Sequence, residues 1–307
     1  MADSNYINKN EITVLLVRSA TKVRKDIIDN CSTLKIIGRG GVGMDNIDVD
    51  YAREKGLHVI NTPAASSRSV AELVFAHLFS MVRYLFDANQ KMPLEGETKF
   101  KELKKSYGAG TEVKGKTIGI IGTGNIGSVM AKIMNGFGCK ILANDLQPDT
   151  ALVELCSVEY TSLEDLCKKC DIITLHIPLS YENHQLINKR RLGWMKKEAI
   201  LINTSRGAIV EHKALIHALE TRQLGGYCAD VYEKENGVYF KDNSDDGIKD
   251  EQLKKLLSFS NVLLTPHQAF VTTEALENIA KITIQNLNDF EEGKTCKNEI
   301  GYETLIL

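Results

Sequence analysis

The chain has 307 residues and is 43% hydrophobic, so it is long enough to bury the cores of two domains. Lys and Arg total 38 against 40 for Asp and Glu, a formal net charge of -2, which argues against a nucleic-acid or membrane surface recognised by bulk charge. The N-terminus, MADSNYINKN, lacks the apolar core of a signal peptide, and no run approaches the roughly 20 apolar residues needed to span a bilayer. We therefore expect a cytoplasmic protein with no nucleic-acid or membrane partner.

Short apolar runs alternate with helical stretches along the chain, which is the pattern of βαβ units and a parallel sheet. Strands are predicted at residues 12–18, 34–40, 58–63, 116–122, 140–146, 171–178, 199–206, 226–232 and 261–267. Two long amphipathic helices, about 69–90 and about 272–292, interrupt this rhythm and are long enough to carry the chain between two domains. The lysine-rich stretch 92–110 is predicted to be an exposed linker.

Seven cysteines raise the question of a disulfide framework or a metal site. Cys167 and Cys170 form one CxxC, but no second CxxC or nearby His pair completes a tetrahedral site. We therefore predict no metal, and we place both thiols on the helix LEDLCKKC as small residues in a reducing compartment.

The predicted strand KTIGII leads into a glycine-rich turn, GTGNIG, and then into a helical stretch, which is the setting of a dinucleotide-binding turn. Gly122 allows the tight turn, Gly124 lets the backbone approach a pyrophosphate, and Gly127 permits close packing of the helix on the sheet. Asp145 ends the next strand, near the spacing of about 20 residues expected for the acid that binds a ribose hydroxyl. Its charge would repel a 2′-phosphate, so we expect NAD; the alternative is a strand-turn-helix without a ligand.

Three polar residues follow strands in the second half of the chain: Arg206 in INTSRG, Glu235 in DVYEKE and His267 in LLTPHQAF. A guanidinium binds a carboxylate through two parallel hydrogen bonds, and an imidazole backed by a carboxylate exchanges a proton near neutral pH. Beside a dinucleotide, this set is suited to moving a hydride and a proton together. Each residue also has a structural alternative, such as a surface ion pair for Arg206, and Glu233 competes with Glu235.

GTGNIG with Asp145, then LHIPLSYEN, INTSRGAIV, CADVYEKE and NVLLTPHQAF, make the chain similar to the NAD-dependent D-isomer-specific 2-hydroxyacid dehydrogenases over nearly its whole length. The resemblance implies an α/β protein in which a Rossmann-type doubly wound parallel sheet is inserted into a smaller flavodoxin-like substrate domain. We accordingly expect a substrate domain over residues 1–90 and 272–307 and an NAD-binding domain over residues 91–271. Because the family commonly forms dimers, we also expect a homodimer.

The resemblance assigns roles to the three polar residues. Arg206 would hold the substrate carboxylate and C2 oxygen, His267 would be the acid/base, and Glu235, the second glutamate of DVYEKE, would orient it. Reduction would deliver hydride from nicotinamide C4 to the keto carbon while the imidazolium protonates the alkoxide.

The resemblance also implies cofactor contacts. Backbone groups of Asn125 and Ile126 would meet the phosphates, and Asp145 would bind the adenosine ribose. Three residues would line the adenine side: Ile177, Pro178 and Asn183. Three others would lie near the nicotinamide: Thr204, Ser205 and Asp230. Asp230 would accept a hydrogen bond from the carboxamide and fix the face of the ring that is presented.

The two halves of the chain resemble different branches of the family. Residues 11 to about 110 are similar to D-3-phosphoglycerate dehydrogenases, in which Arg18 and Arg39 would surround a phosphorylated substrate and the amides of Val42 and Gly43 would hold its carboxylate. The remainder is similar to fermentative D-lactate dehydrogenases, in which Phe270 would lie near the substrate methyl. Because the substrate domain builds most of the pocket, the sequence slightly favours 3-phosphoglycerate and 3-phosphohydroxypyruvate over D-lactate and pyruvate.

One departure from the family lies at the start of the chain. Only MADSNYINKNE precedes the first predicted strand, where family members have a further strand and helix, so the substrate domain is predicted to be shortened. We hypothesise that the tail IGYETLIL supplies a replacement strand. A shortened domain also keeps open a function of another class, a non-catalytic NAD-sensing protein or corepressor, against which the intact set of Arg206, Glu235 and His267 argues.

Overall fold

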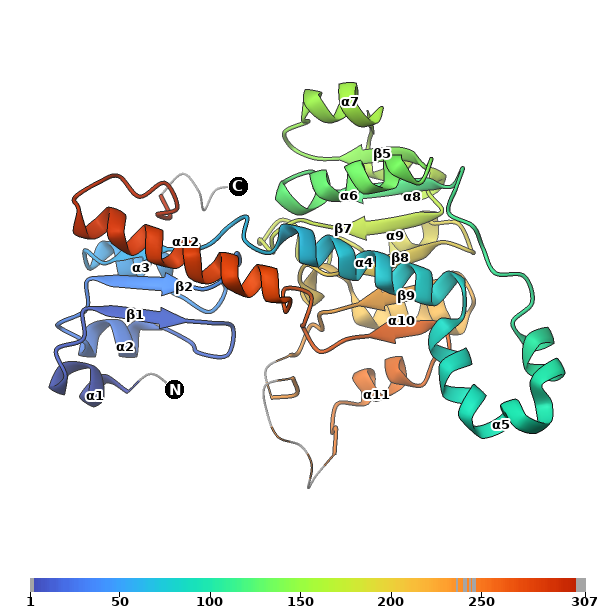
Figure 1. Ribbon diagram of the computed structural model, residues 1–307, viewed down its shortest axis with the longest axis horizontal. Coiled ribbons are helices and arrows are strands. Elements are labelled where there is room, and N and C mark those ends of the chain that lie inside the picture. The colour runs from blue at the N-terminus through green and yellow to red at the C-terminus, as the bar shows by residue number, and fades with distance from the viewer. Residues whose placement is uncertain (1–2, 236, 240–241, 243, 245–246, 302–307) are drawn as a thin grey trace. The chain divides into compact units, whose positions relative to one another are not determined.

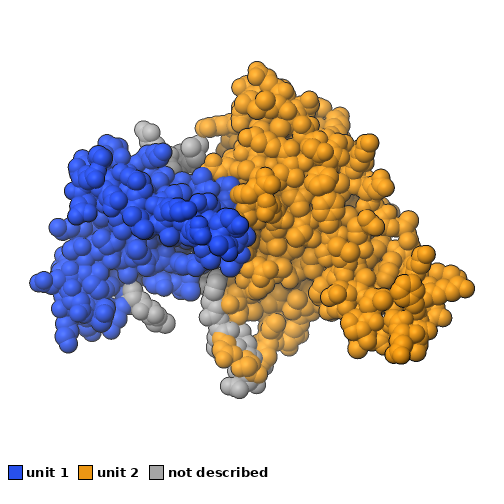
Figure 2. Space-filling view, viewed as in Figure 1, with its two compact units in different colours: residues 1–67, 270–307 blue, residues 68–269 orange. Residues whose placement is uncertain are grey.

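The chain divides into two compact units (Figure 2). Each unit has its own sheet and its own apolar core. Unit 1 consists of residues 1–67 and 270–307, and unit 2 of residues 68–269. The computed structural model describes residues 3–235, 237–239, 242, 244 and 247–301. The first boundary lies at Ser67, before the predicted boundary at residue 90, because the helix that follows packs into the core of unit 2.

Unit 2 is built on a seven-stranded parallel sheet of order β10-β9-β8-β7-β4-β5-β6 (Figure 1). The strands are β4 Thr117–Ile121, β5 Lys140–Asn144, β6 Glu159–Tyr160, β7 Ile172–Leu175, β8 Ile200–Asn203, β9 Gly226–Ala229 and β10 Val262–Leu264. The chain builds the sheet outward from β4 in one direction and then from β7 in the other. The prediction of a doubly wound parallel sheet is therefore confirmed, and the reversal between β4 and β7 is the point at which such sheets bind ligands.

Helices cover both faces of this sheet because its strands are apolar on both sides. Ile120 of β4 belongs to the core packed by α4 and α6, whereas its neighbour Ile121 belongs to the core packed by α8, α9 and α10, as expected when successive side chains point to opposite faces. The helices are α4 Ser67–Val82, α6 Asn125–Gly136, α7 Thr150–Cys156, α8 Leu163–Lys169, α9 Lys189–Trp194, α10 His212–Glu220 and α11 Glu251–Leu257.

The prediction of a linker at residues 92–110 is wrong, because most of this stretch belongs to the helix α5, Leu85–Ser106. Acid and lysine side chains spaced four apart, Asp87 with Lys91 and Glu95 with Lys99, form ion pairs that favour helix in a polar sequence. Pro93 lies inside α5 and Lys99 has non-helical angles, so the helix is kinked. In the described part of the chain no single helix is both long and apolar enough to cross a membrane; α4 and α5 meet both conditions only together, as a pair bent by 55°.

Unit 1 contains a parallel sheet of three strands in the order β1-β2-β3, packed with helices around a small apolar core. The strands are β1 Val14–Val17, β2 Ile36–Arg39 and β3 His58–Ile60, and the helices are α1 Ser4–Lys9, α2 Lys25–Asn30, α3 Val49–Glu54 and α12 Thr273–Glu291. Glu299 makes an antiparallel bridge with Ile60 beside β3. The predicted replacement strand falls mostly on residues 302–307, which lie outside the described residues.

The two cysteines of the CxxC lie at α8 as predicted, Cys167 within the helix and Cys170 at its C-cap. Both are fully buried, and burial raises the pKa of Cys167 to about 11 and that of Cys170 to about 12. Because the thiolate is the reactive form, these side chains act as small apolar residues at neutral pH.

Candidate active site

His267 and Glu235 form a partly buried pair in unit 2. Nδ1 of His267 lies 2.8 Å from Oε2 of Glu235, and the two side chains are only 19% and 16% exposed. The backbone N–H of Tyr232 donates to the other carboxylate oxygen of Glu235 at 3.0 Å, which fixes the carboxylate on its own turn. His267 has φ +55, a left-handed conformation that a non-glycine residue rarely adopts and that the surrounding turn must hold in place.

The competing glutamate, Glu233, has a different partner. Its carboxylate lies 3.3 Å from Nδ1 of His212, a side chain that is 1% exposed at the start of α10. The contact with His212 holds the pKa of Glu233 below its usual range. The structure thus brings Glu235, and not Glu233, to His267.

Arg206 follows β8 in a turn that a buried asparagine braces. Asn203 accepts from the N–H of Ser205 at 3.0 Å and donates to the carbonyl of Arg206 at 2.9 Å. A Cβ on the next residue, Gly207, would lie 2.1 Å from the carbonyl carbon of Tyr232, so this turn packs directly on the turn that holds Glu235. Because β8, β9 and β10 are parallel neighbours, the turns that carry the three predicted catalytic residues follow the same edge of the sheet.

Asp230 is completely buried at the end of β9 and is surrounded by donors from its own unit. Oδ1 accepts from the Thr265 hydroxyl at 2.5 Å and from the Gln268 N–H at 2.9 Å, and Oδ2 accepts from the Ala269 N–H at 2.7 Å. Burial raises the pKa of Asp230, and these three hydrogen bonds partly oppose that rise. The carboxylate therefore holds residues 265–269; its predicted contact with a carboxamide remains a proposal.

The glycine-rich turn has the shape that a pyrophosphate requires. Gly122 has φ +91, and a Cβ there would lie 2.6 Å from the carbonyl oxygen of His176. A Cβ on Gly127 would lie 1.9 Å from the carbonyl oxygen of Gly122, whereas a Cβ on Gly124 would meet nothing within 4 Å. Gly124 is also the N-cap of α6 and provides no side-chain cap for the amides of Asn125 and Ile126. The open face and the helix start together fit the phosphates of a dinucleotide.

Asp145 supports this turn. One carboxylate oxygen accepts from the N–H of Thr123 at 2.5 Å and from its hydroxyl at 2.9 Å, and the other accepts from the N–H of Gln147 at 2.9 Å. The predicted ribose acid therefore also braces the residue between Gly122 and Gly124, a role that the sequence did not indicate.

The other predicted cofactor residues lie in two turns of unit 2. Asn183 accepts from the N–H of Ser180 and donates to the carbonyl of Pro178, which closes the loop after β7. The Ser205 hydroxyl donates to the carbonyl of Ile177, joining that loop to the turn of Arg206. The Thr204 hydroxyl is buried and, among the described residues, has no hydrogen-bond partner. An orphaned hydroxyl at this position fits a bound cofactor that completes its hydrogen bonding.

The predicted substrate residues all belong to unit 1, whereas the groups described above belong to unit 2. Arg39 is only 8% exposed and donates to Asn46 at 2.9 Å and to Ser19 at 3.1 Å. Arg18 is exposed, and its guanidinium carbon lies 4.6 Å from the centre of the Phe270 ring. The side chain of Asn61 donates to the carbonyl of Val42, which shapes the turn of Val42 and Gly43. The two predicted arginines thus have different surroundings, one buried and one exposed.

Sequence reasoning missed the polar residues that support the site. Asn203, Thr123 and Thr265 brace the turns of Arg206, the glycines and Asp230, and His77 lies behind Thr265. Asn before Thr-Ser-Arg-Gly is a recognisable turn signal, so Asn203 was accessible from sequence. His77 was not, because 188 residues separate it from Thr265.

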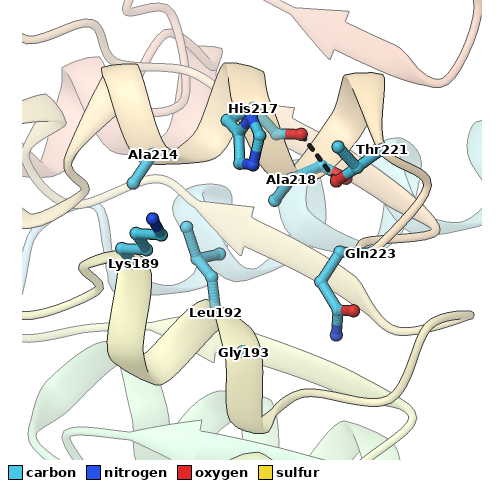
Figure 3. Close-up of a pocket in the computed structure, with 8 residues that line it drawn as sticks. All are labelled: Lys189, Leu192, Gly193, Ala214, His217, Ala218, Thr221 and Gln223. Carbon is cyan, nitrogen blue, oxygen red and sulfur yellow. Dashed lines mark hydrogen bonds between the residues drawn. The ribbon is translucent and has the colours of Figure 1, made fainter.

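A hollow of about 300 Å³ lies between α9 and α10 and is lined by Lys189, Leu192, Gly193, Ala214, His217, Ala218, Thr221 and Gln223 (Figure 3). The Thr221 hydroxyl donates to the carbonyl of His217 on its rim at 2.8 Å. None of the predicted site residues lines this hollow, so the hollow is not part of the candidate active site.

Comparisons with known proteins agree with the family that the sequence motifs indicate. Residues 75–269 match the model of the D-isomer specific 2-hydroxyacid dehydrogenase, NAD binding domain. D-lactate dehydrogenase of Escherichia coli K12 is 40% identical over 272 residues, covering 87% of this chain and 79% of that protein. D-3-phosphoglycerate dehydrogenase of Methanocaldococcus jannaschii is 38% identical over 289 residues, covering 94% of this chain and 51% of that protein. The solved structure of Aquifex aeolicus D-lactate dehydrogenase complexed with NAD and lactic acid matches with a TM-score of 0.85 at 33% identity, covering 97% of this chain and 89% of that one.

Proposed function

The chain belongs to the D-isomer specific 2-hydroxyacid dehydrogenases, NAD-dependent oxidoreductases that act on the CH–OH group of donors, and we propose that it interconverts a short 2-oxo acid and its D-2-hydroxy acid. The observation that carries this proposal is the pairing of His267 with Glu235 at 2.8 Å, beside the turn of Arg206. The intact pair argues against the alternative of a non-catalytic NAD-sensing protein or corepressor.

The pairing determines which ring atom of His267 exchanges the proton. An ionised carboxylate only accepts hydrogen bonds, so Nδ1 of His267 donates to Glu235. Nε2 is then the atom that gives a proton to the C2 oxygen during reduction and takes it back during oxidation. Glu235 stabilises the imidazolium. Because the Tyr232 N–H holds the Glu235 carboxylate in place, Glu235 also fixes the orientation of the His267 ring.

Arg206 and the cofactor supply the remaining chemistry. NADH, when bound, provides the hydride. The Arg206 guanidinium binds the substrate carboxylate in two parallel hydrogen bonds and places C2 for attack, and Asn203 keeps the turn of Arg206 in shape.

The surroundings of Arg18 and Arg39 in unit 1 favour a different substrate from the one that the sequence favours. Arg39 is buried and bonded to Asn46 and Ser19, which leaves Arg18 as the exposed guanidinium of the pair. A phosphate dianion is best held by two guanidiniums, whereas the Phe270 ring beside Arg18 suits a small apolar group. We therefore propose pyruvate, reduced to D-lactate, as the first candidate substrate. The second candidate is 3-phosphohydroxypyruvate, because the exposed guanidinium of Arg18 could bind its phosphate.

The substrate proposal is tested by NADH oxidation with pyruvate, hydroxypyruvate and 3-phosphohydroxypyruvate. We expect the highest kcat/KM with pyruvate. Arg18→Gln should leave pyruvate turnover within about twofold, while Arg24→Gln serves as a control on an arginine bonded to the Asp45 carbonyl. A kcat/KM highest for 3-phosphohydroxypyruvate that falls about 10-fold or more in Arg18→Gln would reverse the order of the candidates. NADH binding without turnover of any 2-oxo acid would favour the corepressor.

We also propose that the protein is a cytoplasmic homodimer. The helix α5 exposes large apolar side chains, among them Leu94 at 83% and Phe100 at 62%, which a partner chain would cover. Light scattering should give twice the chain mass, and Leu94→Glu with Phe100→Glu should reduce it to one chain mass. A single-chain mass for the unmodified protein would contradict the proposal.

A further inference from the structure

His77 is a buried histidine outside the catalytic set. It lies in the last two turns of α4, is 2% exposed, and places Nε2 3.1 Å from the hydroxyl oxygen of Thr265, just after β10. Both residues belong to unit 2, so the contact lies within one compact body. A polar ring buried under the edge of the sheet that carries His267 calls for a physical explanation.

The direction of the hydrogen bonds follows from counting protons. The Thr265 hydroxyl has one proton and donates it to Asp230 at 2.5 Å, so it accepts the hydrogen bond from His77. His77 is therefore the Nε2–H tautomer. Burial lowers the pKa of His77 to about 4, which keeps the ring neutral at neutral pH. Its Nδ1 has no partner among the described residues, a cost that an apolar residue filling the same space would avoid.

Asp230, which accepts the hydrogen bond from Thr265, also holds the turn of His267. Asp230 accepts from the Gln268 and Ala269 amides, and its carbonyl accepts from the N–H of His267 at 2.8 Å. These bonds hold the backbone of His267, whose φ is +55, and of the two residues that follow it. We call His77, Thr265 and Asp230 the His77 network.

We propose that His77 is a positioning residue for proton transfer: it fixes the Thr265 hydroxyl on Asp230, and Asp230 in turn fixes the turn that presents His267 to Glu235. The inference rests on the proposed role of His267 as the acid/base. It assigns to α4 a part in the reaction that goes beyond packing.

The first test compares variants of α4. His77→Leu removes the donor and should lower kcat about 10-fold, as expected for the loss of one hydrogen bond, with the NADH Kd unchanged. His77→Gln keeps a side-chain N–H donor and should restore most of the rate. Leu78→Ala, a fully buried neighbour without polar atoms, should lower the Tm while kcat stays within about twofold. Equal kcat losses in His77→Leu, His77→Gln and Leu78→Ala would mean that His77 only packs, which would overturn the proposal.

A double-mutant cycle tests the path through Thr265. Thr265→Val keeps the shape but removes the hydroxyl, so adding His77→Leu to it should change kcat by less than about twofold. If the two single losses multiply in the double variant, His77 acts by another route and the network is wrong.

Nuclear magnetic resonance separates this inference from the proposed function, because it needs no turnover. The ring ¹⁵N shifts of His77, assigned by their loss in His77→Gln, should be those of a neutral Nε2–H ring at neutral pH and should move in Thr265→Val. An Nδ1–H ring or an imidazolium would overturn the network whatever the activity. Full turnover by His267→Ala would instead overturn the catalytic proposal while this readout still reports on the network.

Discussion

At the residue scale, two glutamates of one turn are distinguished by the histidines they meet. Glu235 bonds His267 and accepts from the Tyr232 amide, while Glu233 points to the buried His212. Because a carboxylate stabilises most strongly the imidazolium that it contacts, the two glutamates should differ in their effect on catalysis.

This difference gives a matched pair of variants. Glu235→Gln should lower kcat by about 10²-fold or more, because the uncharged amide stabilises the imidazolium less than a carboxylate. Glu233→Gln changes the same chemical group two residues away and should keep kcat within about threefold, with its effect appearing as a lower Tm. Steady-state NADH oxidation measures both. Equal losses in the two variants would remove the assignment of Glu235.

The residues of the site were predictable where a motif carried them. The family register selected Glu235 over Glu233, and the structure supplies a physical reason, since the carboxylate of Glu233 contacts His212 instead of His267. Arg39 illustrates what sequence cannot give: its bonds to Asn46 and Ser19 depend on how the end of β2 meets two loops of unit 1. Asp145 was expected to face a ribose, and its second role on Thr123 emerges only from the fold.

At the element scale, α6 contains two glycines with opposite environments. A Cβ on Gly127 would lie 1.9 Å from the carbonyl oxygen of Gly122, whereas a Cβ on Gly136 would meet nothing within 4 Å. Packing therefore requires a glycine at position 127, whereas at position 136 a substitution changes only the helix propensity.

Alanine at each position should consequently have opposite effects on stability. Gly127→Ala should lower the free energy of unfolding by about 1–3 kcal/mol and weaken NADH binding, because the glycine-rich turn must shift to make room. Gly136→Ala should raise the free energy of unfolding by about 0.5–1 kcal/mol and leave NADH binding unchanged. Urea unfolding and NADH fluorescence measure the two quantities. Tight NADH binding by Gly127→Ala would contradict the placement of the phosphates.

The strands could be predicted from sequence more completely than the helices. Each predicted strand contains an observed one, because a strand buried on both faces has a short continuous apolar run that is visible in the sequence. The two-residue strand β6 was too short to produce a pattern. The helix α5 was not predicted because its polar composition resembles that of a linker, although ion pairs spaced four residues apart along one face favour a helix.

At the scale of the whole molecule, burial of His77 makes the fold sensitive to acid. The folded pKa of about 4 lies below the unfolded value of 6.5, so the unfolded chain takes up the proton first as the pH falls. The stability tied to a neutral His77 is therefore complete above pH 6.5 and is lost progressively towards pH 4.

His77→Gln should remove this part of the pH dependence. Between about pH 7.5 and about pH 5 the unmodified protein should lose about 2 kcal/mol more of its free energy of unfolding than the variant does. Urea unfolding at the two pH values gives the comparison, in which carboxylates shared by both proteins cancel. Parallel pH profiles would show that His77 is not held neutral by burial.

The central claim is that the pair of His267 and Glu235 moves the proton of an NAD-dependent reduction. Single-turnover oxidation of bound NADH by pyruvate, compared between the unmodified protein and His267→Ala, tests it most directly. The account predicts that the unmodified protein forms D-lactate, and that His267→Ala reacts about 10²- to 10⁴-fold more slowly while its NADH Kd stays within about twofold. A variant that reacts as fast as the unmodified protein, or an unmodified protein that binds NADH and reduces no 2-oxo acid, would contradict it.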